Sequence, residues 1–272
     1  MVGLEDLAFP LLTGVAVVLV TLVADRLGGR VGGLLATAPV TTTAAHVVIA
    51  MSVAPEAAAA RVLAGSAALL AGTFGIVAFF YGVKYTRGNP SRARLLAGLA
   101  IYLAVFFGLT SVFATFTLHP VSAFTIFFAM HAALAFTFMR EPVPPLADYQ
   151  PRTTRRTALE LASRFAAGAL VVAAIQLLVR VYPPFAGALA VVPAVFLVSL
   201  TVMGLRQNAP FAARAAQAGL FGTTAVGVFV LVIAAGLALR LPGGVWGAVP
   251  FAWMAYGGTL LALGAVHRRI AR

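Results

Sequence analysis

The sequence predicts an all-α polytopic membrane protein in which nine transmembrane helices form two inverted four-helix repeats around one connecting helix. Three observations lead to this prediction. Hydrophobic residues make up 62% of the 272 residues and charged residues only 10%, too few to cover the surface of a water-soluble domain. The chain divides into nine apolar segments, most of them about 20 residues long, the length that crosses a bilayer as a helix. Part of the first half is repeated in the second half.

The apolar segments are separated by loops that contain charged residues, glycine or proline. They cover residues 8–24, 31–53, 61–85, 95–119, 121–139, 158–181, 185–205, 211–239 and 246–266. The long polar connection at 140–156 contains four prolines and divides the chain. The sequence therefore predicts a first repeat at 1–118, a connector helix at 119–139, a cytoplasmic linker at 140–156 and a second repeat at 157–272.

The repeat aligns residues 6–39 with residues 160–193, without a gap, at an offset of 154 residues. Ten of the 34 aligned positions are identical, among them Gly14 with Gly168 and Pro39 with Pro193. We interpret this as an internal duplication. Because five spans precede the second copy, it crosses the membrane in the opposite direction, so the two copies are inverted repeats.

The positive charges predict the orientation of the chain. Sixteen of the 19 Lys and Arg residues fall on one side of the predicted spans, and the other side has only Arg61, Arg180 and Arg240. Positive residues concentrate in cytoplasmic loops, so we expect the N-terminus outside the cell and the C-terminus in the cytoplasm. The expected location is the plasma membrane. The net charge of +12 then indicates contact with anionic membrane lipids rather than with nucleic acid.

One segment of the second span combines polar residues with a helix breaker. Pro39 cannot donate a hydrogen bond to the carbonyl of Leu35, and Pro193 has the same effect at the matching position of the second repeat. Interrupted helices at matching positions of two repeats either mark a central binding site or serve helix packing. The same two uses apply to Gly33 and Gly187, for which packing is the simpler interpretation.

The polar side chains of this segment are candidate ligands. Threonine in a helix can bond a carbonyl one turn back, so threonines alone are weak indicators of a site. His46 adds to them, because an imidazole inside a span either exchanges protons or donates to a neighbouring helix. The predicted substrate-binding residues are Thr37, Pro39, Thr41, Thr42, Thr43, His46 and Pro193.

Other patterns limit the chemistry. The chain has no cysteine, and all its carboxylates fall at span ends or in loops, so we do not expect ion coupling through a buried carboxylate. No nucleophile elbow, phosphate loop, metal-spaced cluster or cofactor motif occurs, so we expect neither an enzyme nor a cofactor or metal site. His131, in the middle of the connector span, is a minor candidate. Glu160 and Arg164, four residues apart, are expected to form an ion pair at the membrane interface.

The segment around Gly33, Pro39 and His46, with the later run from Glu56 to Arg61, resembles the small four-span GlpM-type membrane proteins. On this resemblance the chain is a tandem inverted fusion of two four-span units. The resemblance implies a membrane role associated with bacterial polysaccharide production.

These observations lead to an expected function. We expect a transporter of a small molecule that works by alternating access, with its site where the second and seventh spans cross. The alternatives are a passive channel and a non-transporting scaffold or accessory protein for envelope or polysaccharide synthesis. Expected partners are membrane lipids, an unidentified small-molecule substrate and a second copy of the chain in a homodimer.

Overall fold

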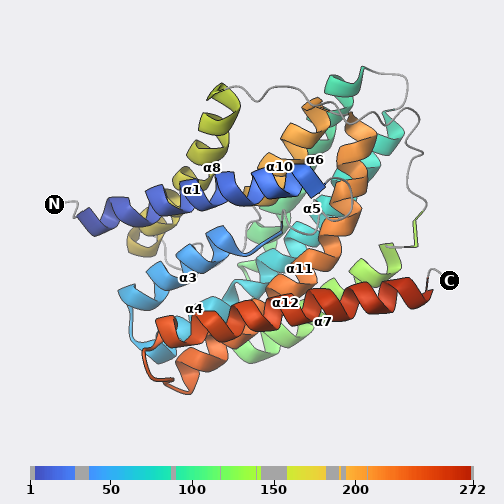
Figure 1. The fold of residues 1–272 in the computed structure, drawn as a ribbon. Coiled ribbons are helices and arrows are strands. Elements are labelled where there is room, and N and C mark those ends of the chain that lie inside the picture. Colours follow the sequence, from blue (N-terminus) through green and yellow to red (C-terminus); the bar gives the residue numbers. More distant parts are fainter. Residues whose placement is uncertain are drawn as a thin grey trace.

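The structure is a computed structural model that describes residues 4–27, 37–86, 90–116, 118–138, 140–141, 158–181, 190, 194–206 and 208–270. These residues form helices and short connections, with no β-strand among them (Figure 1). The helices are α1 Leu4–Leu27, α3 Val40–Ser52, α4 Pro55–Ala64, α5 Ser66–Tyr85, α6 Ser91–Phe113, α7 Pro120–Phe138, α8 Ala158–Val181, α10 Ala194–Arg206, α11 Ala209–Ala238 and α12 Val245–Ile270. The all-α prediction is confirmed for this part of the chain.

Several helices are long and apolar enough to cross a membrane. The six candidates are Pro55–Tyr85, which joins α4 and α5, then α6, α7, Ala158–Leu178 of α8, α11, and Val245–Ala265 of α12. Shorter apolar helices lie at Ala8–Val23, Val40–Ser52 and Phe196–Arg206. The prediction of a multi-pass membrane protein agrees with these six helices. Of the predicted spans 31–53 and 185–205, the described helices α3 and α10 cover Val40–Ser52 and Ala194–Arg206.

The helices of the two halves begin at a constant separation. The first residues of α1, α3, α4 and α6 lie 154 residues before those of α8, α10, α11 and α12, respectively. The lengths also match, with 24 residues in α1 and α8 and 13 residues in α3 and α10. α7 lies between the two sets. The spacing of the helices therefore follows the offset of the sequence repeat.

The centre of the molecule is formed by α4, α5 and α11. In the most apolar 18 residues of each candidate span, 67% are buried in Pro55–Tyr85 and 78% in α11, but 33% or less in the other spans. α11 packs against α4, α5, α10 and α12, and α5 also packs against α6 and α7 (Figure 1). Small residues allow this close approach, because Gly219 and Gly227 of α11 lie against the rings of Phe196 and Phe128.

The central helices run in opposite directions. Arg240, directly after the end of α11, pairs with Glu56 at the start of α4. Near the start of α11, Gln217 donates to the carbonyl of Glu141 at 2.9 Å, and Glu141 pairs with Lys84 near the end of α5. The end of α11 therefore lies beside the start of α4, and its first turns lie at the level of the end of α5.

The first helix of each half crosses the other at a pair of glycines. A Cβ atom on Gly14 of α1 would lie 2.7 Å from the Phe165 ring, and one on Gly168 of α8 would lie 2.6 Å from a methyl group of Val17. The Cβ built on Gly168 would also come within 3.4 Å of the Cα of Gly14. These two glycines occupy matching positions of the sequence repeat, and α1 and α8 touch there almost backbone to backbone.

Three of the residues singled out in the sequence and most of the linker lie outside the described residues. Gly33, Gly187 and Pro193 are among them, as is the linker segment 142–156. The connector helix predicted at 119–139 is present as α7, Pro120–Phe138.

The crossing of α1 and α8 predicts a specific destabilisation. We expect Gly14→Ala to lower the free energy of unfolding by about 1–3 kcal/mol, because the new methyl group meets both the ring and the carbonyl oxygen of Phe165. Gly108→Ala on α6 is the matched control, since no atom lies within 4 Å of the added Cβ. Thermal unfolding in detergent measures both variants. Equal midpoints for the two would contradict the crossing.

Candidate functional site

The predicted polar segment leads into α3. Pro39 is the N-cap residue of α3, which begins at Val40, so the proline precedes the helix rather than bending it. The carbonyl of Pro39 accepts the backbone N–H of Thr43 at 2.7 Å and the hydroxyl of the same residue at 2.5 Å. Thr43 therefore satisfies its own hydroxyl, as threonines in helices commonly do.

Thr37 lies against α11 and α12. Its hydroxyl is 3.4 Å from the phenol oxygen of Tyr256, and its side chain occupies the space that a Cβ atom on Gly222 would need. Only a glycine at position 222 leaves room for it. Thr37 is therefore a contact between the segment before α3 and the second half of the chain. The sequence identified Thr37 but gave no signal for Tyr256 or Gly222, which are far away along the chain.

His46 presents a buried acceptor. Its side chain is fully buried in α3, and its Nδ1 lies 2.7 Å from the carbonyl oxygen of Thr42. A carbonyl can only accept, so Nδ1 carries the hydrogen in the neutral ring and Nε2 carries a lone pair. Nε2 has no hydrogen-bond partner among the described residues. This atom can accept a hydrogen bond from an N–H or O–H group of a ligand.

Among the predicted site residues that the structure describes, all except the half-buried Thr43 are buried. Thr41 and Thr42 have exposed fractions of 2% and 4%. Two pockets of the described residues, one between α6, α8 and α10 and one between α5 and α6, are lined by other residues. The position of Pro193 relative to the predicted site lies outside the described residues.

A second histidine connects the two halves of the chain. His131 of α7 is fully buried between Thr73 of α5, which contacts its Nδ1, and Thr224 of α11, whose hydroxyl is 3.0 Å from its Nε2. Both hydroxyls also lie within hydrogen-bond distance of carbonyls on their own helices, at 2.9 and 3.1 Å. A neutral imidazole donates only once, so one of the threonines must donate to the ring. His131 thus fixes α7 to both central helices.

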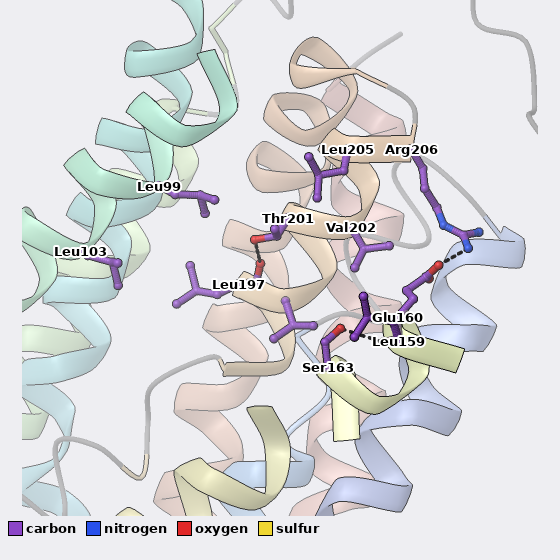
Figure 2. A pocket seen from close by; sticks show the side chains of 11 residues that line it. Leu99, Leu103, Leu159, Glu160, Ser163, Leu197, Thr201, Val202, Leu205 and Arg206 are labelled. Atoms are coloured by element: carbon purple, nitrogen blue, oxygen red, sulfur yellow. Dashed lines mark hydrogen bonds and ion pairs between the residues drawn. The ribbon is translucent and has the colours of Figure 1, made fainter. Parts of the chain in front are cut away.

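A groove that the sequence did not predict lies between α6, α8 and α10. It has a volume of about 760 Å³, within the roughly 300–1,000 Å³ of ligand sites in proteins. Figure 2 shows leucines of α6 on one side and side chains of α8 and α10 on the other. Its lining residues are Leu99, Leu103, Leu159, Glu160, Ser163, Leu197, Val198, Thr201, Val202, Leu205 and Arg206. The walls are apolar and one end is charged.

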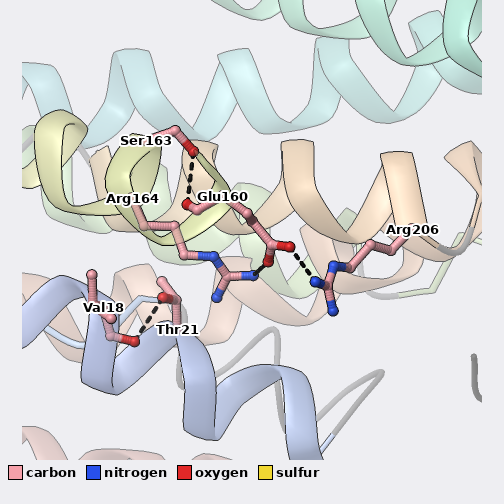
Figure 3. A network of polar contacts seen from close by, with 6 residues as sticks. All are labelled: Val18, Thr21, Glu160, Ser163, Arg164 and Arg206. Carbon is pink, nitrogen blue, oxygen red and sulfur yellow. Dashed lines mark hydrogen bonds and ion pairs between the residues drawn. The ribbon is translucent and has the colours of Figure 1, made fainter. Parts of the chain in front are cut away.

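The charged end is an ion-pair network (Figure 3). Glu160 accepts from Arg164 on the same helix at 2.6 Å, as the sequence predicts, and also from Arg206 of α10. The Arg164 side chain is fully buried, whereas 14% of Glu160 and 22% of Arg206 remain exposed. The pair is therefore more buried than an ordinary interfacial pair. No pattern in the sequence relates Arg206 to Glu160, so this contact was not predicted.

Comparison of the chain with family models, with curated proteins and with solved structures gives no match. Within the described residues, no group of three or more His, Asp or Glu side chains is placed to hold a metal ion. Function is therefore inferred from the arrangement of the helices and from the buried polar groups.

The ion-pair network predicts a contrast between two glutamates. We expect Glu160→Ala to lower the free energy of unfolding by about 3 kcal/mol, because it removes the carboxylate beside the buried Arg164. Glu56→Ala is the matched control. It removes the partner of Arg240, whose side chain is 74% exposed, and we expect almost no change. The midpoints of thermal unfolding in detergent measure both variants. A similar loss of stability in Glu160→Ala and Glu56→Ala would contradict the network.

Proposed function

We propose that the chain is a membrane transporter of a small molecule, built from two inverted four-helix repeats around α7. The observation that carries this proposal is the relation between the central helices. α4–α5 and α11 begin 154 residues apart, at matching positions of the repeat, and run in opposite directions. Inverted repeats relate the two membrane faces by a pseudo-two-fold axis in the membrane plane, the architecture of many transporters that work by alternating access.

The ion pairs support the proposed orientation in the plasma membrane, with the N-terminus outside and the C-terminus in the cytoplasm. Lys84 pairs with Glu141, and Arg206 with Glu160, and the charge distribution assigns all four residues to the cytoplasmic side. Glu56 and Arg240, assigned to the outside, pair with each other. Each of these pairs thus joins residues assigned to the same face.

Cysteine labelling tests the orientation. The wild-type chain contains no cysteine, so it serves as the unlabelled control. We expect Ala57→Cys and Leu239→Cys, both at exposed positions, to react with a membrane-impermeant maleimide in intact cells. Arg92→Cys and Arg140→Cys, also exposed, should react only after permeabilisation. If Ala57→Cys and Arg92→Cys label alike in intact cells, the proposed topology is wrong.

We place the substrate site at the start of α3. The short helices α3 and α10 occupy matching positions, as the half-helices of transporters do. Thr37, Thr41, Thr42 and His46 are buried beside this point, and the Nε2 lone pair of His46 favours a ligand that carries a hydrogen-bond donor. Pro39 at the start of α3 supplies the helix break, and we assign Pro193 the same role in the second repeat.

Transport by proteoliposomes tests this site. Vesicles are loaded with the small-molecule fraction of a cell extract, and efflux is measured by mass spectrometry against protein-free vesicles. We expect His46→Ala to reduce efflux of the transported compound by about tenfold or more, because it removes a buried hydrogen-bond acceptor. Thr42→Val should have a smaller effect. Leu261→Ala, at an exposed position of α12, is the control. If efflux is unchanged in both His46→Ala and Thr42→Val, the substrate does not bind at the proposed site.

Two alternatives predict different results. A passive channel would give currents above carrier rates. A non-transporting scaffold would give a folded protein without efflux of any compound, and the complete burial of His46 is the observation that favours it. That result would support the accessory role in envelope or polysaccharide synthesis that the resemblance to GlpM-type proteins implies.

A further inference from the structure

We propose that the groove between α6, α8 and α10 binds one anionic phospholipid, with an acyl chain along its apolar walls and the phosphate at Arg206. This proposal does not depend on transport. The groove opens at an exposed apolar surface, where Leu103, Leu159 and Leu205 are 42%, 79% and 54% exposed. Within a bilayer, an apolar groove at such a surface is accessible to acyl chains rather than to water-soluble molecules.

The charged end of the groove favours an anionic headgroup. Glu160 stands there between two arginines, Arg164 and Arg206 (Figures 2 and 3). Arg206 lies at the rim, and a guanidinium has more N–H donors than its one ion pair with Glu160 uses. The other polar side chains of the groove bond their own helices, Ser163 to the carbonyl of Glu160 and Thr201 to that of Leu197. Arg206 is therefore the group that a phosphate would meet.

The position that the repeat relates to this groove, between α12, α1 and α3, lacks its features. At an offset of 154 residues, Ser163 corresponds to Phe9 and Leu99 corresponds to Trp253. Phe9 stacks on Trp246 with ring centroids 6.2 Å apart, and Trp253 packs edge-on against Phe229 at 6.0 Å. The rim residue Arg206 corresponds to Ser52. At that position aromatic side chains fill the space between the helices, whereas the groove between α6, α8 and α10 has the smaller Leu99 and Ser163, with Arg206 at its rim.

The expected membrane face agrees with the headgroup. The charge distribution assigns Arg206 to the cytoplasmic side, and the cytoplasmic leaflet carries anionic lipids that attract arginine by about 1 kcal/mol per residue. For one rim arginine this corresponds to about a fivefold preference for an anionic over a zwitterionic lipid.

Native mass spectrometry of the purified full chain tests the proposal, after delipidation in detergent and addition of phosphatidylglycerol or phosphatidylcholine. We expect the wild type to retain one phosphatidylglycerol about fivefold more readily than phosphatidylcholine. Two variants fill the groove with the residues of the other half. Leu99→Trp and Ser163→Phe should each reduce retention of both lipids by about tenfold. Arg206→Gln should remove the preference for phosphatidylglycerol and leave phosphatidylcholine retention unchanged.

Matched variants outside the groove separate this site from general lipid contact. Leu261→Trp on α12 and the exposed Arg240→Gln should behave as the wild type. Only variants that elute from size-exclusion chromatography as a single folded species are compared. One folded groove-filling variant, either Leu99→Trp or Ser163→Phe, is sufficient to test the proposal. Equal retention of the two lipids by the wild type would overturn the proposal. Wild-type levels of bound phosphatidylglycerol in a folded Leu99→Trp or Ser163→Phe variant would also overturn it.

Discussion

The contact between α11 and the pair α4 and α5 is the one on which the remaining helices depend. Lipid tails are as apolar as leucine, so helices in a bilayer are held together mainly by close packing and by hydrogen bonds. α11 provides close packing through glycine and alanine, and each glycine admits a large neighbour. Gly219 receives Phe196 of α10, Gly222 receives Thr37, and Gly227 receives Phe128 of α7. Helices from both halves and the connector are therefore anchored on one helix.

Buried polar groups divide into three kinds with different consequences. Hydroxyls such as that of Thr43 bond a carbonyl of their own helix and need no partner elsewhere. His131 bonds two other helices and so fixes α7 between the halves. His46 uses only one nitrogen, and its second nitrogen faces the interior without a partner in the described residues. A buried acceptor without a donor costs free energy, and this cost is the physical reason for the ligand proposed at His46.

The sequence predicted the helices well, because apolar segments and loop charges are local properties. The offset of 154 residues, found from identities in residues 6–39, also matches the starts of α4 and α6, which lie outside the aligned segment. The site was predictable only in part. Thr37 and His46 could be found as polar residues in an apolar run, but Tyr256 and Gly222 could not, because their contacts depend on how distant helices align. The groove was missed for the same reason, since its walls come from three helices and its charge network joins Glu160 to Arg206 across 46 residues.

The spacing of Glu160 and Arg164 has a consequence for how the protein is made. A lone arginine raises the free energy of inserting a helix into the bilayer by about 2.5–3.5 kcal/mol at the membrane centre and less toward its ends. Because the carboxylate is one turn away on α8, the charge of Arg164 is already compensated when that helix leaves the translocon. Arg206 follows on α10 and reaches a site that Glu160 already occupies. The order of synthesis thus brings in the second arginine only after its counterion is in place.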